Sequence, residues 1–488
     1  MSASRSSQST AFVPRTGLTL AAVAGVQLLV SLDLSIVNVA LPDIGEGLSF
    51  DAVGLSWVIH SYALTFGGLL LLGGKLADVV GRRRMLLIGL ALFAAASLLA
   101  GIAVHAGHLV AARGLQGVGA AAMQPASLAV LASTFPEGRA RARAFGIWSA
   151  VNALGGALGV LIGGVVTEYA GWRWVMLLNV PVALGAMVLS FRAVPREGSP
   201  RSGARPDIIG GVLATAGMTL LVFTVVRTAH FGWTAPATLL GLLAAFCLVI
   251  LFVVVERSPS REPLLRLGLL RNRNVTGSNV VNLLIGAAMA SCFYFVSLYV
   301  QLVLGHDPAI TGLMFLPLAI GVIFGAGVAI RLTPRLSARS FLVIGTLITA
   351  AGFASFGTMS ADGAFLTHVL GPSVVTSLGF GLCLGPLVST ATADVAEEET
   401  GMASGLLASA RQIGASLGLA ALGTVAHYRI GTSTDPAILS HGYGRGMTVG
   451  ALLLIVAAGV AFFVLPAPRC DRTSRPDIAP DREGVGNA

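Results

Sequence analysis

Long apolar stretches separated by short polar loops run through almost the whole chain. Each is about as long as the ~20 apolar residues that a helix needs to cross the hydrocarbon core of a bilayer. Fourteen stretches fall at residues 17–41, 53–73, 85–105, 107–134, 144–168, 173–191, 209–227, 236–256, 274–304, 308–330, 341–358, 366–392, 402–427 and 446–466. The pattern predicts an all-α integral membrane protein with fourteen spans. Because 274–304 is long enough to be tilted or broken, twelve or thirteen spans remain alternatives.

Composition excludes a soluble enzyme. Of 488 residues, 55% are hydrophobic and 11% are charged, and the mean hydropathy is +0.84. Soluble proteins carry about 25% charged residues, and their cores could not bury this much apolar sequence. No polar stretch exceeds a few tens of residues, which leaves no room for a second folded domain.

The basic residues set the topology. The net charge is +9, but the arginines lie in short loops between apolar runs, so we do not expect nucleic-acid binding. With a cytoplasmic N-terminus, the inner loops hold nineteen Lys and Arg residues. The outer loops hold only Arg173, Arg227, Arg429 and Arg445. The positive-inside rule therefore predicts that both termini are cytoplasmic, which requires an even number of spans.

The loop after the second span reads GKLADVVGRRR over residues 74–84. Gly74 and Gly81 permit a sharp reversal, and we expect a tight inner turn between them. Asp78 can cap a helix or pair with an Arg across the bundle, and such a pair can open and close. The alternative is a solvated basic loop, including Arg82, that only fixes topology.

Several motifs in order resemble the fourteen-helix drug:proton antiporter branch of the major facilitator superfamily. They are the 74–84 loop, LDLSIVNVALP at 32–42, RGLQGVGAA at 113–121, WRW to NVP at 172–181 and GLLASARQIGASLG at 405–418. The resemblance covers nearly the whole chain. It is specific for the family but not for a substrate.

The resemblance implies a major facilitator fold with two six-helix halves and an inserted helix pair. The expected division is a cytoplasmic tail at 1–16, a half at 17–192, the pair at 209–256, a half at 274–466 and a second cytoplasmic tail at 467–488. It implies a monomer in the bacterial cytoplasmic membrane that exports amphipathic drugs or antibiotics in exchange for protons by alternating access. No cofactor is implied, and Asp78 with Gly74, Gly81 and Arg82 would form the inner gate.

The fifth span departs from the family pattern. The antiporter motif has Pro where this chain has Val160, although Gly155, Gly159, Gly163 and Gly164 are all present. Glycines at this spacing let helices pack closely in lipid, whereas Pro would add a kink. We therefore expect the packing to be kept and the kink to be lost. The missing Pro is also the best support for the alternative function, a proton-linked importer or facilitator of a small nutrient.

Three ionisable residues lie at one depth inside the spans. From the outer face, Asp33 is roughly 12 Å deep, His60 roughly 10 Å and Arg113 roughly 9 Å, at 1.5 Å per helical residue. An unpaired charge there costs at least about 2.5–3.5 kcal/mol, so we expect Asp33 and Arg113 to face each other. Gln116, one turn from Arg113, could complete the network.

The pair can act as a proton switch. A change in its separation or hydration between outward-open and inward-open states could load or release a proton on Asp33. The alternative is an ion pair that only fixes helix register. His60 could join the proton pathway, or it could be a hydrogen-bonded core histidine.

We expect the substrate cavity to be lined by Asn38, Tyr62, Gln116, Tyr299 and Arg411. Arg411 has no acid on its own helix, and its alternatives are snorkelling or pairing with Asp394 or Glu397. Two Arg against one Asp inside the membrane favour monocationic, neutral or acid-bearing lipophilic substrates over dications. The chain has no nucleotide-binding G-x-x-x-x-G-K-[ST] loop, no metal-ligand spacing and no catalytic cluster, so neither an ATP-driven pump nor an enzyme is expected.

Overall fold

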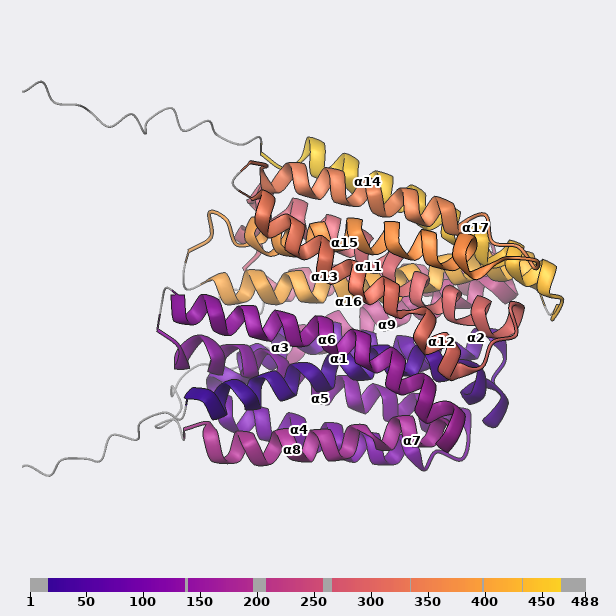
Figure 1. The fold of residues 1–488 in the computed structure, drawn as a ribbon. Helices are drawn as coiled ribbons and strands as arrows, with labels where there is room; N and C mark the ends of the chain where they lie inside the picture. The colour runs from indigo at the N-terminus through magenta and orange to yellow at the C-terminus, as the bar shows by residue number, and fades with distance from the viewer. Residues whose placement is uncertain are drawn as a thin grey trace, which may run out of the picture.

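The computed structural model describes residues 16–466 except 137–138, 196–207, 258–265, 334, 397–398 and 432. The described chain is helical and contains no β-strand. Fourteen of its helices are long and apolar enough to cross a membrane, which confirms the predicted number of spans. The helices run roughly alongside one another, and the first and last described residues lie at the same end of the bundle (Figure 1). We call this the terminal end and the opposite one the far end.

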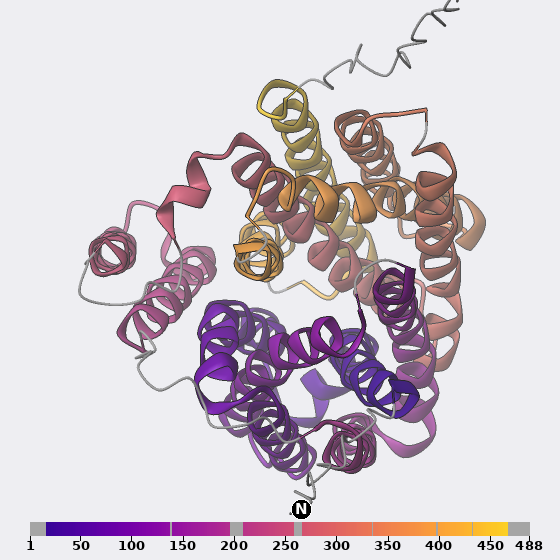
Figure 2. The ribbon, with the colours of Figure 1, turned by 90° about the vertical axis from the view of Figure 1, so that its left-hand side faces the viewer.

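The first six spans form one group of helices. They comprise α1 (Thr16–Gly47), α2 (Ala52–Leu55), α3 (Trp57–Val80), α4 (Arg82–Gly101), α5 (Ala106–Thr134), α6 (Arg139–Ala170), α7 (Trp172–Leu177) and α8 (Asn179–Ala193). The short helix α2 precedes α3 at the far end, and α7 and α8 together make the sixth span. Viewed from the terminal end, these helices form the lower, purple half of the molecule (Figure 2).

The last six spans form the other half. They comprise α11 (Arg273–Leu298) with its π-helical continuation η2 (Tyr299–Val303), α12 (Pro308–Met314), α13 (Leu316–Leu332), α14 (Ala338–Phe356), π-helical η3 (Phe365–Leu370), α15 (Gly371–Ala391), α16 (Thr400–Ile430) and α17 (Pro436–Phe463). A short 3₁₀ helix η1 (Leu267–Arg271) precedes α11. The long apolar run at 274–304 stays one helical span, because α11 passes directly into η2 after Leu298.

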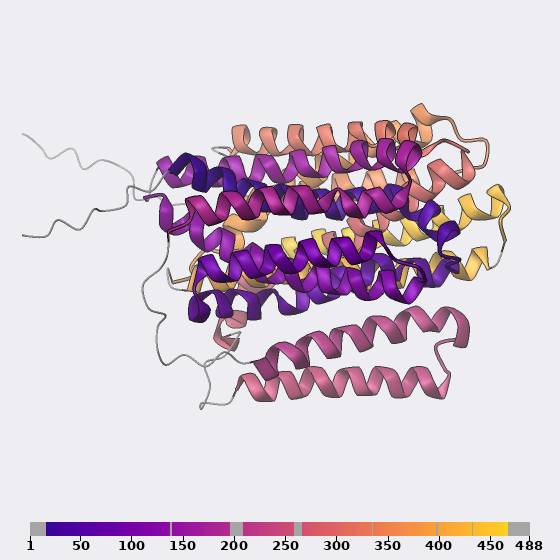
Figure 3. The same cartoon turned by 90° about the horizontal axis from the view of Figure 1, so that it is seen from below.

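Two helices lie outside these halves. α9 (Ile208–Phe231) and α10 (Pro236–Glu256) form a hairpin along one side of the bundle (Figures 2 and 3). α9 packs against α3 and α16, one helix from each half. The Thr424 hydroxyl of α16 donates to the Val225 carbonyl of α9 at 3.4 Å. The pair therefore lies beside the seam between the halves.

Helix ends differ most from the apolar pattern where small or charged residues continue a helix. α17 begins at Pro436, ten residues before the predicted start at 446. The apolar pattern missed its first turns because they are rich in glycine and carry Arg445. α3 continues to Val80, so Gly74 lies within a helix and the predicted turn over 74–81 is wrong. The reversal takes place at Gly81 alone, whose φ of 102° is in the region that favours glycine.

The glycines of the fifth span bring α6 against α1. A Cβ at Gly159 would lie 2.8 Å from the Leu32 carbonyl oxygen, and one at Gly163 would lie 2.8 Å from the Ile36 carbonyl oxygen. Gly155 faces Ser31 in the same way, whereas Gly164 faces Pro308 of α12 in the other half. α6 remains one helix through the buried Val160. These close contacts are what glycines at this spacing provide in membrane helices.

Three hydrogen bonds join the two halves near the far end. The Ser297 hydroxyl donates to the Asn38 carbonyl at 2.8 Å, and the Gln301 amide donates to the Val39 carbonyl at 3.0 Å. On the other side of the seam, the Ala309 backbone N–H donates to the Glu168 carboxylate at 3.0 Å. The halves are therefore closed against each other at the far end.

We expect Gly159→Ala to lower the free energy of unfolding by about 1–3 kcal/mol, because its methyl group would push α1 away from α6. Gly156→Ala is the matched control, since a Cβ at Gly156 meets only the Ser35 hydroxyl at 3.8 Å. Thermal unfolding in detergent measures both. Equal melting temperatures for the two variants would contradict close packing at Gly159.

Candidate functional site

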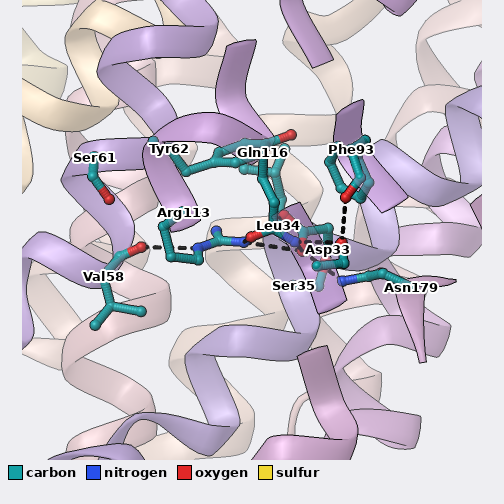
Figure 4. Close-up of polar contacts among 12 residues, drawn as sticks. Asp33, Leu34, Ser35, Val58, Ser61, Tyr62, Phe93, Arg113, Gln116 and Asn179 are labelled. Carbon is teal, nitrogen blue, oxygen red and sulfur yellow. Dashed lines mark hydrogen bonds and ion pairs between the residues drawn. The ribbon is translucent and has the colours of Figure 1, made fainter. Parts of the chain in front are cut away.

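A buried ion pair lies between α1 and α5. The Arg113 Nη1 atom donates to Asp33 Oδ2 at 2.8 Å and to Asp33 Oδ1 at 3.0 Å (Figure 4). The Asp33 side chain is fully buried and that of Arg113 is 2% exposed. The structure thus brings together the two charges that the sequence placed at one depth. Inside a bilayer this arrangement avoids the cost of either charge alone.

Three further contacts hold the guanidinium. Arg113 Nε donates to the Val58 carbonyl at 3.0 Å, and Nη1 donates to the Gln116 side-chain oxygen at 2.9 Å. The Tyr62 ring lies 4.6 Å from the guanidinium carbon. Val58 and Tyr62 are four residues apart and share one face of α3, so this helix supplies both contacts. Gln116 follows Arg113 by one turn of α5, as predicted.

A residue at the start of another helix also holds the Asp33 carboxylate. Asn179, the first residue of α8, donates its side-chain amide to Asp33 Oδ1 at 2.7 Å. Gln116 donates to the Ser97 hydroxyl of α4 at 2.7 Å and lies 3.5 Å from Asp33 Oδ1. Sequence reasoning missed the roles of Asn179 and Ser97. Asn179 was visible as a polar residue in the NVP motif, but nothing in the chain indicated its partner.

The two carboxylate oxygens differ in their surroundings. Oδ1 accepts from Arg113, from Asn179 and, at 3.5 Å, from Gln116, whereas Oδ2 accepts from Arg113 alone among the described residues. A protonated carboxyl group carries one O–H donor. A proton on Oδ2 would have to displace only the Arg113 contact. The arrangement therefore permits Asp33 to exchange the guanidinium for a proton while Asn179 still holds Oδ1.

His60 does not belong to this network. It lies two residues from Val58, so it faces roughly the opposite side of α3. Its neighbours on that face are Trp57, whose ring centroid is 5.7 Å away, and Leu64, which packs against α9 and α16. Both ring nitrogens are buried without a hydrogen bond. The alternative of a hydrogen-bonded core histidine is wrong for the described residues, and the place of His60 in the proton pathway stays a prediction.

Four of the five predicted cavity residues lie inside packed regions. Gln116 and Tyr62 are enclosed with Arg113. The Tyr299 hydroxyl donates to the Ser360 carbonyl at 2.8 Å within the second half. Asn38 donates to Leu34 of its own helix, while its carbonyl joins the closed seam. In this structure Asn38, Gln116 and Tyr299 already have protein partners, whereas the Tyr62 ring stacks on Arg113 and its hydroxyl is buried without a hydrogen bond to the described residues. Their place in a substrate cavity stays a prediction.

Arg411 is the predicted cavity residue that remains available. It lies eleven residues into α16, roughly 16 Å from that helix's start at 1.5 Å per residue, and it is half-buried. Its guanidinium forms no hydrogen bond or ion pair with any residue that the structure describes. Asp394 is engaged instead by Asn274 at 3.1 Å, and Glu397 lies outside the described residues. Arg411 is thus an unpaired cation well inside the bundle.

The predicted gate residues lie at the terminal end. Asp78 is exposed and makes no hydrogen bond or ion pair within the described chain, so the expected latch contact is not formed here. Arg82 begins α4 and reaches the Ala129 carbonyl of α5 at 3.4 Å. Gly81 makes the turn, whereas Gly74 packs near Pro125.

A second polar cluster escaped the sequence reasoning. The Asn152 side-chain oxygen of α6 accepts from Gln27 and from Ser31 of α1, both at 2.6 Å. Gln124 of α5 donates to Gln27 at 3.3 Å. Isolated amides in apolar spans were the available signal. As for metals, no group of three or more potential ligands occurs among the described side chains.

The Major Facilitator Superfamily model matches residues 23–225 and 208–419. The chain belongs to the major facilitator superfamily. Its fold agrees with that of solved transporters: it is similar to a peptide transporter in complex with sulfate, with a TM-score of 0.66, 18% identity and coverage of 91% of this chain and 94% of that one. A bacterial homologue of the human lysosomal transporter Spinster gives a TM-score of 0.63 at 17% identity, covering 92% and 96%.

Several relatives of the chain are resistance or export proteins. The cephamycin export protein CmcT of Amycolatopsis lactamdurans is 41% identical over 455 residues, covering 93% of this chain and 92% of that protein. The puromycin resistance protein pur8 of Streptomyces alboniger is 38% identical over 483 residues, covering 96% and 95%. The methylenomycin A resistance protein of Bacillus subtilis is 32% identical over 405 residues, covering 82% and 85%.

Removing one partner of the ion pair should destabilise this transporter more than removing both. Arg113→Met leaves Asp33 as an unpaired buried charge, and we expect it to lower the free energy of unfolding by about 3–5 kcal/mol. Adding Asp33→Asn should restore most of that loss, because Asn179 can still donate to the amide oxygen. Denaturation in detergent measures this double-mutant cycle. Losses that simply add would show that the two side chains do not depend on each other.

Proposed function

We propose that this protein exports amphipathic drugs or antibiotics in exchange for protons by alternating access. The observation that carries the proposal is the buried Asp33–Arg113 pair, which places a titratable carboxyl group against a cation inside the bundle. The names of the relatives support the direction and the cargo, since they include a cephamycin export protein and a puromycin resistance protein. The bacterial origin of these relatives supports a place in a bacterial membrane.

The described contacts support one step of such a cycle. The halves are joined near the far end, where Ser297 and Gln301 bond α1. In the proposed topology the two tails are cytoplasmic, so this is the state closed to the outside. Asp78 would form its latch contact only after the halves close at the terminal end. The monomer, with halves at 17–192 and 274–466 and the pair at 209–256, would be the working unit.

Proton exchange at Asp33 would couple the steps. In the outward-open state a proton binds Oδ2 and frees Arg113; in the inward-open state the proton leaves and the pair forms again, as in this structure. A membrane potential contributes about 2.3 kcal/mol per 100 mV and a pH difference about 1.4 kcal/mol per unit. With 100 mV and one pH unit, one proton could maintain a gradient of roughly 500-fold in a neutral solute.

Asp33→Asn should abolish active export, because an amide cannot carry the proton. In a bacterial host, we expect wild type to ease growth inhibition by a panel of antibiotics and the variant to behave like cells without the protein. Asp435→Asn is the control, since Asp435 only caps α17 at the far end and Asn also caps helices. Resistance that survives Asp33→Asn would refute the coupling role. Inhibition that worsens with the wild type would instead identify an importer.

The unpaired Arg411 leads to a second prediction, which concerns the chemistry of the cargo. An unpaired cation deep in the bundle favours a substrate that brings a negative or strongly hydrogen-bond-accepting group, and it disfavours dications. We expect Arg411→Gln to reduce the export of acid-bearing antibiotics more than that of neutral ones. Uptake assays in inverted vesicles measure both rates. An equal loss for both classes would contradict direct recognition by the guanidinium.

A further inference from the structure

A cleft of about 760 Å³ opens near the far end of the second half. Three basic side chains line it, Arg429 from the end of α16 and His441 and Arg445 from α17. Three apolar side chains, Ile438, Val449 and Leu452, line the same cleft. It is separate from the Asp33–Arg113 site, which lies in the other half.

The cleft follows one face of α17. His441, Arg445, Val449 and Leu452 recur at helical spacing along that face. His441 and Arg445 lie roughly 8 and 14 Å from the start of α17, and Val449 and Leu452 roughly 20 and 24 Å, at 1.5 Å per residue. Basic groups therefore lie near the far end and apolar groups lie deeper. The Leu452 side chain is 56% exposed, so this face points toward the surrounding lipid.

The basic groups of the cleft have no protein partners. Arg429, His441 and Arg445 make no hydrogen bond or ion pair with any residue in the described ranges. The two other arginines predicted at this end are engaged. Arg173 donates to the Ala103 carbonyl at 3.1 Å, and the Arg227 guanidinium lies 4.7 Å from the Phe231 ring centroid.

Topology does not explain these arginines. The positive-inside rule disfavours Arg in loops on the outer side, where the proposed orientation places this end. Arg429 and Arg445 are nevertheless two of the four present there, and they converge with a His in one cleft. An anion at headgroup depth would provide the missing countercharge.

We propose that this cleft binds an anionic phospholipid of the leaflet at the far end. The phosphodiester would lie among Arg429, His441 and Arg445, where guanidinium groups match phosphate oxygens in charge and geometry. An acyl chain would cover Val449 and Leu452. A lipid fits better than free phosphate because only a lipid also covers the apolar, lipid-facing part of the cleft. The bound lipid would tie the ends of α16 and α17 together.

The test uses the full-length protein purified in detergent. Native mass spectrometry measures binding of phosphatidylglycerol and of phosphatidylcholine to wild type and to Arg429→Gln/Arg445→Gln. We expect wild type to prefer phosphatidylglycerol and the double variant to bind it about thirtyfold more weakly, from about 1 kcal/mol for each of two basic residues. Arg173→Gln/Arg227→Gln removes the same charge from the same end and should leave binding unchanged.

A second variant and a second ligand identify what is bound. Leu452→Asn should weaken phosphatidylglycerol binding while keeping the preference over phosphatidylcholine, because it alters only the apolar end of the cleft. Inorganic phosphate alone should not raise the melting temperature. Equal binding by wild type and the cleft double variant, equal affinity for the two lipids, or full stabilisation by phosphate would each overturn the proposal.

Discussion

A buried carboxylate can remain charged inside a membrane only if a cation and hydrogen-bond donors surround it, and this constraint organises the first half of the protein. Asp33 of α1 accepts hydrogen bonds from Arg113 of α5 and Asn179 of α8. Arg113 in turn uses the Val58 carbonyl and the Tyr62 ring of α3. Four spans thus meet at one ion pair. Any step that moves the guanidinium must rearrange these contacts, so the proposed protonation of Asp33 would be linked to helix movement.

The second half instead contains a half-buried charge that is unpaired in the described chain. Arg411 of α16 lies inside the bundle without a partner in the described chain. Its neighbour Gln412 packs against Gly67 of α3, where an added Cβ would lie 2.7 Å from the Gln412 side chain. The unpaired cation is therefore next to the contact between the halves. Within the described chain, the first half therefore holds a paired, buried charge and the second half an unpaired, half-buried one.

The sequence predicted how deep the ionisable residues lie better than which helix face they occupy. Hydropathy located fourteen spans, and counting residues from the span ends placed Asp33 and Arg113 at one level. The same count placed His60 there, but two residues along a helix turn a side chain to the other face. Periodicity could not reveal this, because α3 contacts apolar neighbours on both faces. Depth alone therefore identified the pair but did not show that His60 faces away from it.

Partners from distant parts of the chain were also beyond the sequence. Tyr299 looked available to a substrate, yet its hydroxyl is used by Ser360, 61 residues away. Helix ends were misjudged where glycine and charged residues prolong a helix, as at Pro436. Motif resemblance supplied the family and the fold. It did not show that Asn179 completes the carboxylate site, because that contact spans 146 residues.

The central claim is that Asp33 gains and loses a proton as cargo is exchanged. Infrared difference spectroscopy of the protein in lipid, recorded on adding a transported antibiotic, tests it directly. We expect a change in a protonated-carboxyl C=O band that shifts with ¹³C-labelled aspartate and is absent in Asp33→Asn. Proton exchange at Asp33 would be contradicted if the transporting wild-type protein showed no such band. The same band in Asp33→Asn would contradict it as well.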